Sequence, residues 1–136
     1  MSVPKSERGV SDFRVLDLAL NLAKHTAQKA SNEKLIPKNK RWVIAYRLIE
    51  SSFDAYENIR SANEIYVKEG DEVAYKIRHE YQLRALASLS RLLGDLDIAH
   101  RLYKLSDDEL TFWAGLCSDT RTALKSWIKS DVKRFG

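Results

Sequence analysis

The apolar residues of this chain recur at steps of three and four along four long segments, and short polar breaks separate these segments. Such spacing places the apolar side chains on one stripe of an α-helix, and each stripe must be buried against another element. Only five glycines and two prolines occur among 136 residues, so the turns that a many-stranded fold requires are few. Four long helices are therefore the predicted elements.

The first predicted helix covers about residues 12–31, with Ser11 as its N-cap. The second follows Pro37, which suits the first turn of a helix, and continues to about residue 68. The third covers about residues 72–103, and the fourth starts at the capping-box sequence Ser106-Asp107-Asp108-Glu109. The predicted apolar stripes consist, helix by helix, of Phe13, Leu16, Leu20, Ala23 and Ala27; of Trp42, Ala45, Ile49, Tyr56, Ile59 and Tyr66; of Ile77, Tyr81, Ala85, Leu89, Leu92, Leu96 and Ala99; and of Leu110, Trp113, Cys117, Leu124, Trp127 and Ile128.

Short breaks force each helix to fold back beside the one before it. The sequence therefore predicts a single all-α domain over residues 1–136, an antiparallel up-down-up-down four-helix bundle with residues 1–10 as a polar N-terminal leader. This leader lacks the apolar run of a secretory signal, and no segment is apolar for long enough to span a membrane. With Cys117 as the single cysteine, no intrachain disulfide is possible, and we expect a cytoplasmic protein without membrane association.

Residues that could support catalysis or metal binding do not converge in the sequence. His25, His79 and His100 are isolated, and none has a second histidine four residues later, as a helical zinc site requires. The acidic group Asp107-Asp108-Glu109 is explained by helix capping. Cys117 lies on the apolar stripe of the fourth helix, where a thiol behaves as a small hydrophobic group. We expect no catalytic residue, no metal, no cofactor and no enzymatic activity.

Two groups of basic residues stand out against a formal net charge of +4 at pH 7. The first group clusters around the first inter-helix connection and comprises Lys38, Lys40, Arg41 and Arg47. The second group, the cationic strip, recurs every four residues along the fourth helix and comprises Arg121, Lys125, Lys129 and Lys133. Successive members of the strip are rotated by only about 40° around the helix, so their charges suit a row of phosphates. The alternative is an ordinary solvated helix face.

Other side chains leave their role open. Arg78, Arg84, Arg91 and Arg101 on the third helix enlarge the basic surface only if they face the same way as the strip. The three tryptophans and several tyrosines suit base stacking, but their helical spacing favours the core or a subunit interface. These tyrosines are Tyr46, Tyr56, Tyr66 and Tyr81.

Several short strings resemble those of the Avd-like four-helix proteins, the accessory variability proteins encoded beside reverse transcriptases in diversity-generating retroelements. They are Val3-Pro4-Lys5-Ser6 with Arg8-Gly9, Asn32-Glu33-Lys34, Pro37-Lys38, Arg41-Trp42, Ala62-Asn63, Ile65-Tyr66-Val67, Tyr81-Gln82, and Trp113, Arg121, Leu124, Trp127 and Ser130-Asp131 near the C-terminus. The resemblance implies a homopentamer of four-helix protomers that binds the reverse transcriptase and its template RNA, or DNA, and so supports mutagenic reverse transcription. Family members bind through basic surface, which here corresponds to Lys38, Arg41 and the cationic strip.

A second hypothesis is a structural scaffold of the kind encoded within ribosomal-RNA intervening sequences, which are related four-helix proteins. On this hypothesis the aromatic residues and the glycines inside the predicted helices, Gly94 and Gly115, serve subunit packing, and the chain does not bind nucleic acid directly.

Overall fold

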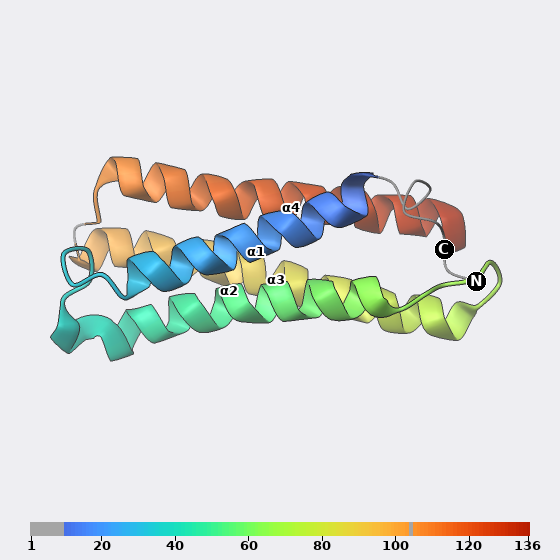
Figure 1. Cartoon of the computed structure of the whole chain (residues 1–136), viewed down its shortest axis with the longest axis horizontal. Helices are drawn as coiled ribbons and strands as arrows, with labels where there is room; N and C mark the ends of the chain where they lie inside the picture. Colours follow the sequence, from blue (N-terminus) through green and yellow to red (C-terminus); the bar gives the residue numbers. More distant parts are fainter. Residues whose placement is uncertain (1–9, 104) are drawn as a thin grey trace.

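The computed structural model describes residues 10–103 and 105–136, with the backbone alone at residues 10–13 and 40–42. Four helices form antiparallel rods that lie side by side: α1 (Val10–Ala30), α2 (Arg41–Glu64), α3 (Glu72–Tyr103) and α4 (Asp107–Phe135) (Figure 1). Each helix packs against the next along the chain, and α4 also packs against α1. The predicted all-α four-helix bundle is confirmed. The predicted leader lies outside the described residues except for Val10, which begins α1.

The start of α4 follows the predicted capping pattern. Ser106 has an extended backbone, and its Oγ accepts a hydrogen bond from the backbone N–H of Glu109 at 3.1 Å. The acidic first turn also suits the positive end of the helix dipole. The Glu109 carboxylate, however, accepts a bond from Lys29 Nζ at 3.2 Å, so the capping segment also links α4 to the end of α1.

Two predicted helix starts differ from the structure. Ser11 lies inside the first turn of α1 and is not its cap. Pro37 precedes a short 3₁₀ turn, η1 (Lys38–Lys40), so α2 starts later than predicted. A rigid proline φ suits this tighter turn as well as it suits an α-helix.

The second helix ends at Glu64, four residues before the predicted end. Beyond it the backbone carbonyl of Ile65 accepts a hydrogen bond from Arg78 Nη1 at 3.3 Å, and the side chain of Val67 is buried. The chain therefore crosses the end of the bundle at this point. Gly70, with a φ of 85°, then turns it into α3, because glycine adopts positive φ without steric cost.

The core contains most of the predicted stripes of α3 and α4. Ala85, Leu89, Leu92, Leu96 and Ala99 are buried on α3, as are Trp113, Cys117, Leu124 and Trp127 on α4. On α2, Ala45 and Ile59 are buried. Ile77 on α3 and Tyr66, which follows the end of α2, are exposed. The side chains of Phe13 and Trp42 lie outside the described residues.

The predicted stripe of α1 is wrong in its rotation. The side chains that α1 places in the core are Val15, Ala19, Leu22, Ala23, Thr26 and Ala30. Among the members of the predicted stripe whose side chains the structure describes, only Ala23 is buried, and Leu20 keeps 36% of its surface exposed. The helix has two adjacent apolar stripes. The stripe through Leu22 lies in the core, whereas the predicted stripe through Leu20 lies beside α2.

A buried polar network joins α3, α4 and the connection after α2. Asp131, which is 1% exposed, accepts bonds from Arg78 Nε at 2.8 Å and from Gln82 Nε2 at 2.9 Å. The Arg78 guanidinium also lies 5.1 Å from the centre of the Trp127 ring. Charged groups are buried at such positions only when they are paired, so this network fixes how α4 lies against α3.

Removing one partner of this pair leaves an uncompensated buried charge. We expect Asp131→Ala to lower the free energy of unfolding by about 3–5 kcal/mol, as measured by urea denaturation. The matched control is Asp97→Ala, which removes a carboxylate from an exposed pair with Arg101 and is expected to cost at most about 1 kcal/mol. Equal losses in the two variants would contradict a structural role for the buried pair.

Candidate nucleic-acid interface

The cationic strip lies on the outer surface of α4. Lys125, Lys129 and Lys133 are exposed, and Arg121 is half-buried. Residues four apart on a helix are separated by about 6 Å along its axis, so the strip extends over roughly 18 Å. Since the helix positions all four side chains, their spacing does not depend on a loop.

The four members of the cationic strip keep their charges available. Within the part of the chain that the structure describes, none of them forms an ion pair with a carboxylate or a hydrogen bond. Arg121 is the most enclosed member, and its Nε is buried without a hydrogen-bond partner. The strip is therefore an uncompensated row of positive charge on a rigid rod.

The first basic group is divided by the structure. Lys38 is exposed at the start of η1, whereas the side chains of Lys40 and Arg41 lie outside the described residues. Arg47 donates through Nε and Nη2 to the buried carboxylate of Asp95, at 3.3 Å for each bond. Arg47 therefore serves first as a bridge between α2 and α3, a role that the sequence did not indicate.

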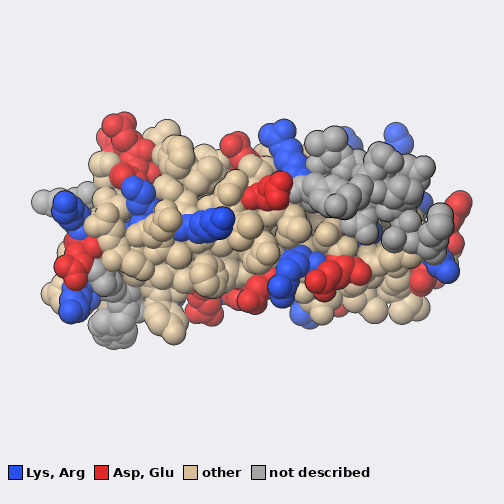
Figure 2. Space-filling view, viewed as in Figure 1, with Lys and Arg blue, Asp and Glu red and all other residues tan. Residues whose placement is uncertain are grey.

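The two basic groups do not meet in space. The connection between α1 and α2 lies at the end of the bundle where α4 begins, while the cationic strip occupies the C-terminal half of α4 (Figure 1). Figure 2, which views the bundle from the side of α1 and α2, shows cationic and anionic side chains interspersed over that face. The candidate interface therefore reduces to the strip itself, with Lys38 as a separate exposed cation.

The arginines of α3 do not enlarge the strip, because each has an anionic partner. Arg78 is buried against Asp131, and the other three pair with carboxylates on α2 or on α3 itself. These pairs are Arg84 with Glu80, Arg91 with Asp54, and Arg101 with Asp97.

Each of the three histidines contacts a different set of neighbours. His79 stacks on Tyr75 with ring centres 5.6 Å apart, and His100 Nε2 lies 2.9 Å from Asp107 Oδ1. His25 packs against the rings of Phe112 and Trp113. Among the described residues no three histidine, cysteine or acidic side chains are grouped closely enough to hold a metal ion.

The aromatic residues divide between the core and the surface. Trp113 and Trp127 are buried, as the helical spacing indicated, and Trp113 Nε1 donates to Thr26 at 2.9 Å. Tyr46 is the most open of the four tyrosines singled out, with 71% of its surface exposed, and it lies on α2, not beside the cationic strip. Base stacking next to the strip therefore has no support from these residues.

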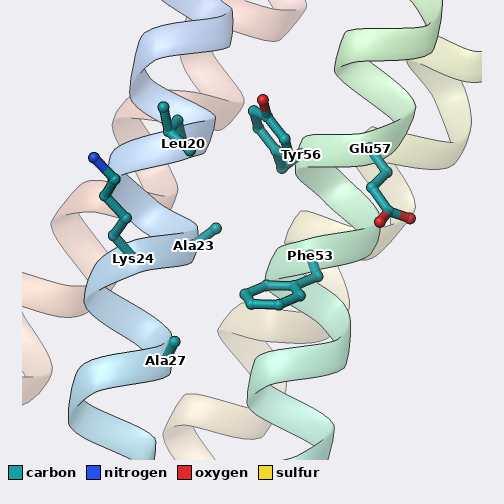
Figure 3. A pocket seen from close by; sticks show the side chains of 7 residues that line it. All are labelled: Leu20, Ala23, Lys24, Ala27, Phe53, Tyr56 and Glu57. Atoms are coloured by element: carbon teal, nitrogen blue, oxygen red, sulfur yellow. The ribbon is translucent and has the colours of Figure 1, made fainter.

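Sequence reasoning missed a pocket between α1 and α2. Its volume is about 360 Å³, and its lining consists of Leu20, Ala23, Lys24, Ala27, Phe53, Tyr56 and Glu57 (Figure 3). Four of these residues belong to the apolar stripes that were predicted for the core, Leu20, Ala23 and Ala27 on α1 and Tyr56 on α2. The sequence signal for the pocket is that α1 carries two apolar stripes, one through Leu22 and one through Leu20. A single core cannot bury both stripes, so the stripe through Leu20 stays at the surface.

Comparisons of the chain with protein-family models, with curated proteins and with solved structures give no match. The family and the partners that the sequence resemblance implies therefore stay predictions. In the described part of the chain, no helix combines the length and apolar character needed to cross a membrane.

Cys117 is fully buried, and its Sγ contacts the carbonyl oxygen of Leu89 at 3.4 Å. Burial raises the pKa of this thiol to about 12, although the charge of Arg121 acts in the opposite direction. We expect a disulfide reagent at about pH 8 to modify the folded protein at least about a hundredfold more slowly than the urea-unfolded chain. Comparable rates would show that the thiol is accessible and reactive.

Burial, reinforced by the nearby Lys29 ammonium and opposed by Glu109, lowers the pKa of His25 from 6.5. The unfolded chain therefore binds more protons near and below that pH, and the free energy of unfolding falls as the pH drops from about 7.5 to about 5.5. We expect His25→Gln to reduce this slope in urea titrations. The difference between the two slopes isolates the contribution of His25, and an unchanged slope would contradict the assignment.

Proposed function

We propose that this chain is a non-enzymatic accessory protein that binds nucleic acid, with RNA as its principal ligand, through the cationic strip of α4. The observation that carries the proposal is that Arg121, Lys125, Lys129 and Lys133 have no anionic partner in the described chain, although most of the arginines on α2 and α3 do. In the setting that the sequence resemblance implies, the RNA is the template of a reverse transcriptase, which is the second partner.

The dimensions of the strip fit a phosphate backbone. Each strand of a B-form DNA duplex carries one phosphate per about 3.4 Å of its axis, so on this scale the roughly 18 Å of the strip span about five phosphates. Cations that neutralise phosphates release bound counterions, and the affinity then falls with salt. Because no groove-reading loop or aromatic platform accompanies the strip among the residues that the structure describes, we expect recognition of backbone charge and shape with little sequence preference.

The test is filter binding of the full chain to a structured RNA at two salt concentrations. Arg121→Gln, Lys125→Gln and Lys129→Gln together are expected to weaken binding at least about tenfold at low salt. They should also reduce the slope of log affinity against log salt by about 2–3, since each lost contact removes slightly less than one counterion.

The matched control removes three positive charges elsewhere, at Lys76, Arg84 and Arg101 on the outer surface of α3. If charge at the strip is decisive, this control changes the affinity and the salt slope far less than the strip variant. An equal effect would reduce the interaction to net charge. Absence of RNA binding at low salt, both with and without the reverse transcriptase, would exclude the proposal.

The scaffold hypothesis makes the opposite prediction for the same variants. A scaffold keeps its partner and its oligomeric state when the strip is neutralised, because its contacts are made through apolar surface. The exposed apolar residues Phe53, Leu102 and Phe112 favour such contacts. Size-exclusion chromatography of the strip variant with its partner therefore separates the two functions. The resemblance implies a homopentamer, which the same measurement tests.

A further inference from the structure

A second pocket lies between α1 and the middle of α4. Its volume is about 260 Å³, and it is lined by Arg14 from α1 and by Asp119, Thr122, Ala123 and Ser126 from α4. The two helices pack side by side at this level (Figure 1). Sites that enclose a small molecule typically measure about 300–1,000 Å³. This smaller site, the α1/α4 pocket, therefore suits one unit of a polymer that lies across the surface.

The α1/α4 pocket shares a border with the cationic strip. Lys125 follows Thr122 by three positions, and Lys129 follows Ser126 by three positions. Residues three apart are neighbours on a helix surface, so these two lysines flank the pocket on α4. Arg14, which is exposed, adds a cation from α1. A nucleic-acid backbone that binds the strip is therefore within reach of the pocket.

The fold does not use the polar groups of the α1/α4 pocket. Within the part of the chain that the structure describes, neither Arg14 nor Asp119 forms an ion pair, although both border the same pocket. The hydroxyls of Thr122 and Ser126 form no hydrogen bond there, whereas the hydroxyl of Thr120, which faces the core, donates to a carbonyl of its own helix at 2.8 Å. The pocket therefore offers a cation, a carboxylate and two hydroxyls to a ligand.

The carboxylate of Asp119 is unexpected beside a row of cations that binds phosphates. A carboxylate repels phosphate groups, and when ionised it accepts hydrogen bonds but cannot donate them. Asp119 therefore favours binding only where the ligand presents a hydrogen-bond donor. The sugar–phosphate backbone of DNA has no such donor, whereas every ribose of RNA carries a 2′-hydroxyl, which both donates and accepts.

We infer that Asp119 accepts a hydrogen bond from a ribose 2′-hydroxyl of the bound RNA, while Arg14 and the flanking lysines contact the adjacent phosphates. The inference rests on the proposed function and adds to it the selection of RNA over DNA. Because the 2′-hydroxyl is present at every nucleotide of RNA, this contact selects the type of nucleic acid and not its sequence.

The test compares an RNA hairpin with the same sequence in which a 2′-fluoro group replaces every 2′-hydroxyl. Fluorine is similar in size to a hydroxyl but cannot donate a hydrogen bond. In filter binding we expect the wild-type chain to bind the RNA at least about fivefold more tightly, because a hydrogen bond to an ionised acceptor is among the stronger ones. Asp119→Ala should bring the two affinities to within about twofold of each other, since it removes the acceptor. It should also tighten binding of the 2′-fluoro RNA, because the repulsive carboxylate is gone.

Two control variants separate this contact from general charge effects. Asp108→Ala removes the same charge from the first turn of α4 and should leave the ratio of the two affinities unchanged. Arg14→Gln should weaken binding of both RNAs about equally and lower the salt slope by about 1, since it removes a phosphate contact that both share. Asp119, Asp108 and Arg14 are all exposed, and circular dichroism of each variant confirms that the fold is retained.

Three results overturn the inference. They are equal affinity of the wild-type chain for the two RNAs, a preference that Asp119→Ala leaves intact, and a preference that follows the base sequence instead of the 2′ group, which would assign Asp119 to base amino groups. Equal affinity for the two RNAs, with binding that still depends on the cationic strip, overturns only the ribose contact. Absence of RNA binding at low salt overturns the proposed function together with this inference.

Discussion

Burial of one apolar stripe from each of four helices in a common core is the constraint on which the rest of this structure depends. The core is built from aliphatic side chains on α1, α2 and α3, and from two tryptophans on α4, Trp113 and Trp127. Once these side chains are placed, the rotation of every helix about its axis is fixed. That rotation decides which of the remaining residues meet another helix and which meet solvent.

The distribution of charge follows from these rotations. Asp95 and Asp131 are turned inward, where a carboxylate must be paired, and each takes a guanidinium from α2 or α3. The arginines that pair with these carboxylates are less available to bind an external anionic ligand. Asp131 turns inward from the same helix as the cationic strip, but Arg78 and Gln82 of α3 bind its carboxylate, so the lysines of the strip stay in solvent. The contrast between arginines paired with carboxylates and unpaired lysines is the physical basis for proposing an anionic ligand at α4.

The sequence predicted some elements better than others, for identifiable reasons. The helix α3 has one continuous apolar stripe, and both its ends and most of its buried residues agree with the prediction. By contrast α1 carries two adjacent stripes, one through Leu22 and one through Leu20, and periodicity cannot rank them. The end of α2 was predicted too late because the carbonyl of Ile65 is bound by Arg78, which lies 13 residues away and is oriented by Asp131. Such a contact leaves no mark on the local pattern.

The amino-acid sequence alone determined the number and order of the helices, the capping of α4 by Ser106, and the spacing of the cationic strip. All of these depend on residues within a few positions of each other, where helix geometry fixes the distances. Only the tertiary structure decided that Arg47 would bind Asp95, 48 residues away, and that Leu20 and Phe53 would border a pocket on the surface. The reason is that these relations depend on how neighbouring helices are rotated against each other, and packing of the whole core sets that rotation.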